Sequence, residues 1–139
     1  MTTPQPDRRW RHLPGCFGCG TSESSLGIVF DHLAGSVRAR ATFDGRHVGA
    51  PGMVHGGVIM TLLDEAMGSV AATGGPQRVT ASISVDFRRP VLLGRPVIAE
   101  AVITETAERG YLVEATLAHE DEPHLIRASA TARFVLMSG

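Results

Sequence analysis

One long amphipathic helix is the feature of this sequence that most limits how the chain can fold. Across residues 57–72, apolar side chains recur at helical spacing: Val58, Ile59, Leu62, Leu63, Ala66, Met67 and Val70. A Gly-Gly-Pro sequence at 74–76 ends the pattern. Because no other segment repeats this spacing, the apolar face of the helix has only β structure to pack against.

Most of the remaining chain has the pattern of β-strands. Before the helix, an apolar run at 26–33 and an alternating segment at 36–43 flank an Ala-Gly turn and predict a hairpin, followed by an irregular loop at 44–54. After the helix come four segments rich in β-branched residues, at 78–87, 95–106, 111–119 and 124–136. The predicted order β-β-α-β-β-β-β is that of an α+β fold, with one helix against a curved antiparallel sheet.

The composition is that of a single globular domain. With 139 residues, 43% of them hydrophobic and 19% charged, the chain is long and apolar enough to form its own core, which excludes intrinsic disorder. Residues 1–25 are rich in Pro, Gly, Ser and Thr and predict an N-terminal arm, anchored by Trp10 and Leu13. The domain itself is expected to cover residues 26–139.

Charge and cysteine content limit the partners of the chain. Thirteen basic and fourteen acidic side chains give a formal charge of −1, which provides no attraction to nucleic acid or to an anionic membrane. Every basic residue is Arg, which excludes a Schiff-base lysine and the lysine of a P-loop. No segment has the apolar length of a signal peptide or membrane span, and two cysteines are too few for a secreted disulfide framework. We therefore expect a cytoplasmic protein without nucleic-acid or membrane partners.

The second face of the predicted helix is unusual for a solvated surface. It carries Gly57, Thr61, Asp64 and Gly68, of which only Asp64 is charged. Two glycines and a threonine weaken the helix, which indicates close approach by another backbone or a ligand. The loop before it, Gly-Met-Val-His-Gly-Gly at 52–57, places flexible residues at the helix N-terminus, where free amides attract negative charge. A helix N-terminus and a carboxylate on one face are suited to acyl transfer.

The string His-Gly-Gly-Val-Ile-Met-Thr-Leu-Leu-Asp-Glu-Ala-Met-Gly at 55–68 strongly resembles the hotdog-fold acyl-CoA thioesterases, above all the phenylacetate-pathway and 4-hydroxybenzoyl-CoA groups. Their pattern places a catalytic Asp or Glu nine residues after the His, and here that position is Asp64. The segment Val-Asp-Phe-Arg-Arg-Pro at 85–90 resembles the strand that follows the helix in this family. The resemblance covers residues 26–136, and the sequence Cys-Phe-Gly-Cys-Gly at 16–20 is similar to a segment of one subgroup.

The resemblance implies hydrolysis of an acyl-CoA thioester to a carboxylic acid and free CoA, without a metal or other cofactor. Asp64 would be the general base or the nucleophile, and the sequence leaves both open. The Gly56 amide would polarise the thioester carbonyl, and Gly57 would shape the same helix terminus. In relatives a Ser or Thr at the start of the following strand orients the water or the carboxylate. Counting back from Pro90 places it at Thr80, with Ser82 as the fallback.

Several other residues are weaker candidates for the active site. His55 is expected to hold its loop by hydrogen bonds rather than to act as a base. Thr61 lies on the same predicted helix face as Asp64, and we expect it to bind substrate. Arg88 and Arg89 alternate across the strand, so one of them points away from the sheet core, towards either a CoA phosphate or solvent. Some relatives have an Asn six residues before the His; this chain has Gly there, at position 49, and His47 is a possible substitute.

Three further acidic or thiol groups are expected to be structural. Glu65 lies about 100° around the helix from Asp64, so pairing with an Arg is favoured over a second catalytic acid. Cys16 and Cys19 have a metal-like spacing, but a structural zinc site needs four ligands and only His12 lies nearby. Packing of the arm is therefore favoured over redox chemistry, and no metal is expected.

The length of the helix predicts the oligomeric state. Gly56 and Asp64 are eight positions apart, which is about 12 Å along a helix, so no single thioester carbon can touch both. We expect a homodimer with active sites shared between chains, or a tetramer built from two such dimers. Two other functions stay open: hydratases of the same fold, which have a different His-containing loop, and a non-catalytic acyl-CoA sensor, for whose DNA-binding segment a 25-residue arm is too short.

Overall fold

The long helix predicted from the apolar spacing is present in the computed structural model as α2 (Gly56–Ala72). The structure describes residues 14–73 and 78–136, so the Gly-Gly-Pro stop signal and the proposed anchors Trp10 and Leu13 lie outside the described residues. The helix begins one residue before the predicted start because His55 caps it. At its other end, the Thr73 amide donates hydrogen bonds to the carbonyls of Val70 and Ala71.

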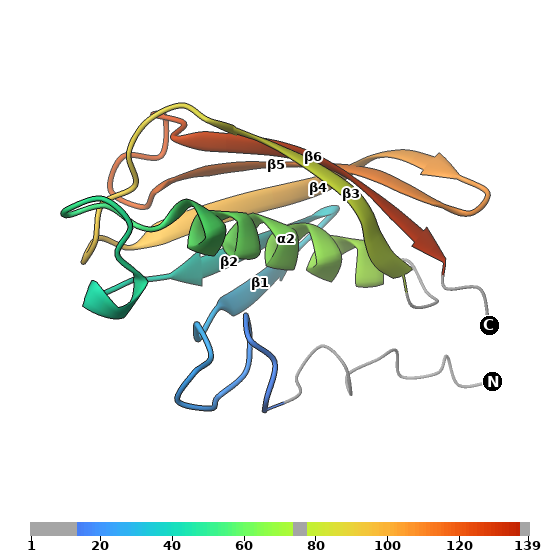
Figure 1. Ribbon diagram of the computed structural model, residues 1–139. Helices are drawn as coiled ribbons and strands as arrows, with labels where there is room; N and C mark the ends of the chain where they lie inside the picture. Colours follow the sequence, from blue (N-terminus) through green and yellow to red (C-terminus); the bar gives the residue numbers. More distant parts are fainter. Residues whose placement is uncertain (1–13, 74–77, 137–139) are drawn as a thin grey trace.

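In the part of the chain that the structure describes, six antiparallel strands form one sheet around this helix, as the α+β prediction requires. They are β1 (Val29–Leu33), β2 (Ser36–Ala41), β3 (Arg78–Phe87), β4 (Val97–Ala107), β5 (Gly110–His119) and β6 (Ala128–Leu136). Their order in the sheet is β1-β2-β4-β5-β6-β3, and the sheet curves around α2 (Figure 1). A hotdog fold has this arrangement, so the expected fold class is confirmed.

The loop before the helix and the bounds of several strands differ from the sequence prediction; β1, for example, begins at Val29 rather than at Leu26. The irregular loop before the helix contains a short 3-10 helix, η1 (Gly45–His47), capped by the carboxylate of Asp44. Strand β6 begins at Ala128, four residues later than predicted. The residues before it form turns that the buried Arg127 holds in place, because its guanidinium donates hydrogen bonds to the Pro90 carbonyl and to Glu122.

The core lies between the apolar face of α2 and the concave face of the sheet. On the helix, the predicted apolar residues are buried, except Val58, which is only partly so. Opposite them, β4, β5 and β6 present many small side chains, and the buried ones are Ala99, Ala101, Ala115, Ala128, Ala130 and Ala132. Small residues on the sheet leave room for the helix to pack closely.

An irregularity in β3 separates two residues that simple alternation would place on one face. Thr80 pairs with the buried Phe134 of β6, whereas Ser82 pairs with the exposed Arg133, and the register shifts between them. One extra residue in β3, a β-bulge, has this effect because it inverts the alternation beyond it. Thr80 therefore faces the helix and Ser82 faces the opposite side of the sheet.

The described part of the predicted arm folds back on the start of the domain. The amide of Leu26 donates to the carbonyl of Phe17 at 2.7 Å, and that of Ile28 donates to Gly18 at 3.0 Å. Leu26 and Ile28 are themselves buried in the core. These contacts hold residues 16–18 beside the helix. Within the described ranges, no helix has the length and apolar character needed to cross a membrane.

Candidate active site

The N-terminus of α2 has one amide that is used by its cap and one that is free. The Nδ1 atom of His55 accepts a hydrogen bond from the Gly57 amide at 2.9 Å. Among the hydrogen bonds of residues 14–73 and 78–136, none uses the amide of Gly56. A Cβ at position 57 would lie 3.2 Å from His55 Nδ1, so glycine there protects the cap. A free amide at a helix N-terminus is suited to hold an oxyanion.

The carboxylate of Asp64 on α2 is hydrogen-bonded by a residue of the sheet. Thr80 on β3 donates a hydrogen bond from its hydroxyl to Asp64 Oδ1 at 2.7 Å. Of the two hydroxyl residues proposed from the sequence, Thr80 is thus the one that the structure brings to Asp64. Both residues line a hollow of about 450 Å³, to which Phe17, Met60 and Ile83 add apolar surface. A carboxylate beside an apolar hollow is suited to activate water next to an acyl group.

Thr61 lies in the same hollow, one turn before Asp64. Its hydroxyl is already used, since it donates to the carbonyl of Gly57 at 2.9 Å within the helix. His47, considered as a substitute for a missing side chain at Gly49, belongs to η1. Its ring packs edge-on against Phe43, with the ring centroids 5.3 Å apart, and its Nδ1 accepts from the Asp44 amide. The structure therefore gives His47 a local role in its own loop.

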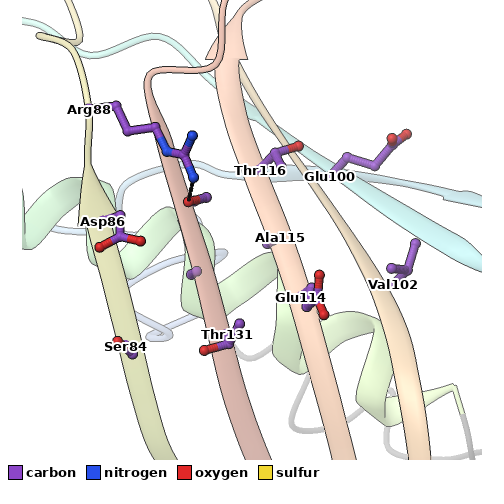
Figure 2. A pocket seen from close by; sticks show the side chains of 11 residues that line it. Ser84, Asp86, Arg88, Glu100, Val102, Glu114, Ala115, Thr116 and Thr131 are labelled. Atoms are coloured by element: carbon purple, nitrogen blue, oxygen red, sulfur yellow. Dashed lines mark hydrogen bonds between the residues drawn. The ribbon is translucent and has the colours of Figure 1, made fainter.

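The remaining sequence candidates, Ser82, Arg88 and Arg89, lie away from Asp64. Figure 2 shows the convex side of the sheet, where Arg88 points into a second hollow of about 470 Å³ and donates a hydrogen bond to Ser129 at 3.2 Å. The same hollow contains the carboxylates of Asp86, Glu100 and Glu114. Three carboxylates around one guanidinium disfavour a CoA phosphate there.

Ser82 faces this convex side because of the bulge in β3. Arg89 is exposed beyond the end of β3, and its amide donates to the carbonyl of Arg127 at 3.0 Å. The structure thus groups Asp64, Thr80 and Thr61 in one hollow and does not bring Ser82, Arg88 or Arg89 to it.

The sequence analysis favoured a pair between Glu65 and an arginine, but within residues 14–73 and 78–136 Glu65 forms no such pair. Among the described residues, its hydrogen-bonding partners are the thiols of Cys16, at 3.7 Å from Oε1, and Cys19. Burial raises the pKa of Glu65 above its usual value. Sequence periodicity could not find this contact, since Cys16 is 49 positions away in a segment without regular structure.

Comparison with known proteins identifies the family. A sequence model of the thioesterase superfamily matches residues 51–125, more than half of the chain. A mouse protein named acyl-coenzyme A thioesterase THEM4 is 30% identical over 117 residues, which is 81% of this chain and 50% of that protein. The chain therefore spans about half the length of this curated relative.

Solved structures agree on the fold. The phenylacetic acid degradation protein PaaI of Thermus thermophilus, solved in a mutant form, is 27% identical with a TM-score of 0.73, over 81% of this chain and 95% of that one. A Streptococcus mutans protein solved with acetyl-CoA bound is 22% identical with a TM-score of 0.70, over 79% and 90% of the two chains. With the fold and the family match in agreement, the chain belongs to the thioesterase superfamily.

Proposed function

We propose that the protein hydrolyses acyl-CoA thioesters, with Asp64 as the group that activates or replaces water. The observation that carries this proposal is the hydrogen bond from Thr80 to Asp64 beside a largely apolar hollow. The thioesterase family and the acyl-CoA thioesterase name of the mouse relative support the same substrate class.

The hydrogen bond from Thr80 assigns different tasks to the two oxygens of Asp64. Because Oδ1 accepts from the hydroxyl, Oδ2 is left to take a proton from water. The water oxygen then bonds to the thioester carbon, and the carbonyl oxygen becomes an oxyanion held by a Gly56 amide. Breaking the carbon–sulfur bond releases the acid, and the proton on Asp64 passes to the CoA thiolate.

A covalent route has the same residues in other roles. Asp64 itself would attack the thioester carbon, expelling CoA and forming a mixed anhydride that water then cleaves. The two routes separate in a single turnover in ¹⁸O-labelled water. Label in the Asp64 carboxylate indicates the anhydride, provided that water attacks the enzyme's carbonyl, and label confined to the acid product favours the general base.

The proposed site needs two chains. Gly56 and Asp64 lie in α2 eight residues apart, which corresponds to about 12 Å, too far for both to touch one reacting carbon. We therefore assign the amide at each site to the partner chain of a homodimer. Strand β3, at the edge of the sheet and mostly exposed, is where a second copy can approach. A tetramer formed by two such dimers would keep the same shared sites.

The test is release of free thiol from a panel of acyl-CoAs of different chain length and aromatic content. We expect Asp64→Asn to lower kcat by at least about a hundredfold, because it keeps the shape of the side chain and removes its basicity. Asp86→Asn, which removes a carboxylate on the convex side of the sheet, is the matched control and should retain wild-type kcat.

Thermal unfolding of both variants checks that the fold is kept. Near-normal kcat in Asp64→Asn would remove Asp64 from the mechanism. Tight acyl-CoA binding by the wild-type protein without thiol release would instead make it a binding protein. Hydration of an enoyl-CoA without thiol release would make it a hydratase.

A further inference from the structure

A cluster of metal-binding groups lies where the N-terminal segment meets α2. It consists of Cys16, Cys19 and Glu65, whose sulfur and carboxylate oxygen atoms all lie within 4.8 Å of one another. The Cys16 sulfur is 3.7 Å from Glu65 Oε1. In tetrahedral zinc coordination, bond lengths of about 2.3 Å to sulfur and about 2.0 Å to oxygen place neighbouring sulfurs about 3.8 Å apart and sulfur and oxygen about 3.5 Å apart. The three groups are therefore close to the spacing that one zinc ion requires.

The turn that carries the two cysteines is built around the Glu65 side chain. A Cβ on Gly18 would lie 2.4 Å from both Cγ and Cδ of Glu65, so a larger residue there would displace the Glu65 side chain. A Cβ on Gly20 would lie 2.3 Å from the Pro14 carbonyl, so glycine is also required where the turn closes. The Cys19 amide lies 3.4 Å from the Cys16 sulfur and donates to it. Amide donors of this kind stabilise a thiolate that ligates a metal.

In their deprotonated forms, the two thiols and the carboxylate carry three negative charges, which a divalent cation would offset in part. None of the ion pairs formed within residues 14–73 and 78–136 includes Glu65. A bound divalent cation favours the deprotonated forms of the thiols and the carboxylate that ligate it.

We propose that Cys16, Cys19 and Glu65 form a zinc-binding site that fastens the N-terminal segment to α2, with a fourth position for water or another ligand. Two thiolates select a soft or borderline cation such as Zn²⁺ over Mg²⁺ or Ca²⁺. Binding releases the two thiol protons, and the bound ion leaves a net charge of −1 on the three ligands together.

This site adjoins the hollow of Asp64 without taking part in its chemistry. Cys16, Gly18 and Glu65 line that hollow, and Glu65 follows Asp64 directly in α2. A metal that fixes the segment would therefore fix one wall of the hollow. The metal site does not depend on the proposed hydrolysis, and its test needs no substrate.

The experiment uses the full chain, reduced and freed of metal by a chelator that is then removed. Zinc is titrated in competition with a chromophoric chelator, and mass spectrometry under native conditions counts the bound ions. We expect one Zn²⁺ per chain with a dissociation constant below about 1 µM, and no displacement by millimolar Mg²⁺. Co²⁺ should give the near-ultraviolet absorption of thiolate ligation.

Variants identify the ligands. Cys16→Ser, Cys19→Ser and Glu65→Gln should each weaken zinc binding by more than about 100-fold, because outer-shell partners of a metal alone are worth about 10- to 100-fold. Glu23→Gln removes an exposed carboxylate from the same segment and should bind zinc like the wild type. A second measurement needs no variant: zinc should protect both cysteines of the wild-type chain from alkylation.

Three results would overturn the proposal. The first is a reduced wild-type chain that binds no zinc at micromolar concentration. The second is zinc binding that survives all three ligand substitutions, which would place the ion on histidines elsewhere. The third is full alkylation of Cys16 and Cys19 in the presence of bound zinc.

Discussion

Substitutions of Thr80 and Ser82 test which residues of β3 face the helix. Thr80→Ala removes the hydrogen bond to Asp64 Oδ1, and we expect kcat to fall on the order of tenfold, since a single orienting bond is lost while the carboxylate remains. Thr80→Ser keeps the hydroxyl and should recover most of the rate. Steady-state thiol release measures both.

Ser82→Ala is the matched control, because this serine lies two positions away but faces the convex side of the sheet. It should leave kcat unchanged. A larger loss in Ser82→Ala than in Thr80→Ala would show that β3 faces the helix differently in solution.

The same pair of residues marks the limit of sequence reasoning about the site. Asp64 and Gly56 were predicted as site residues from a motif within one helix, where spacing alone sets their positions. Thr80 and Ser82 could not be separated that way, because alternation places residues two apart on one face and only the bulge separates them. Glu65 was expected to meet an arginine; its thiol partner lies in a turn that periodicity does not describe.

The connections at one end of the sheet are fixed by a buried histidine at the end of β5. His119 is fully buried; its Nε2 accepts from the Leu92 amide at 3.0 Å and its Nδ1 lies 3.2 Å from the Pro96 carbonyl. The first contact requires an unprotonated Nε2, so the ring is neutral with its proton on Nδ1. Burial lowers the pKa of His119 below the usual 6.5.

This arrangement predicts a loss of stability in acid. As the pH falls below about 6.5, His119 becomes protonated in the unfolded chain but stays neutral in the folded protein. The free energy of unfolding therefore falls by up to about 1.4 kcal/mol per pH unit. Denaturant titrations between pH 8 and 5 measure this slope. His119→Gln should flatten the slope, whereas His124→Gln, an exposed histidine in the next turn, should not. Equal slopes in both variants would assign the acid sensitivity to other groups.

The elements were predicted well where their patterning is local and less well where distant contacts set their ends. The bounds of β3 match the predicted strand, since its alternation and flanking turns lie within the segment itself. The start of β6 was predicted too early. Its true start depends on Arg127 reaching the Pro90 carbonyl, 37 positions away, and no pattern near residue 124 contains that information.

At the scale of the whole molecule, the exposed edge strand β3 is the surface on which we expect a second chain to pair. Among the described strands, β3 has only β6 as a neighbour, and both Val79 and Phe87 on β3 are exposed, at 39% and 53%. Ten residues of exposed edge strand favour pairing with another chain. Since the Gly56 amide and the Asp64 carboxylate of one chain cannot reach the same carbon, the same pairing would complete the proposed site.

Mixed dimers test this sharing of sites. Gly56→Pro removes the amide proton at a position where proline is tolerated, because it is the first residue of α2 and His55 before it is extended, with ψ of 137°. Gly56→Ala keeps the proton and is its control, since a Cβ there meets only ordinary contact with the Phe87 ring at 3.7 Å. We expect Gly56→Pro and Asp64→Ala each to be nearly inactive alone, while Gly56→Ala retains activity.

When the two inactive variants are refolded together in equal amounts, half of the dimers contain one chain of each kind. Every such dimer has one intact site and one site that lacks both groups, so the mixture should recover about a quarter of the wild-type rate. Native mass spectrometry confirms that mixed dimers form, and thiol release measures the recovery. If each site were instead built within one chain, every site in the mixed dimer would lack one group. A mixture with proven mixed dimers and no recovered activity would therefore place the Gly56 amide and Asp64 outside a shared site.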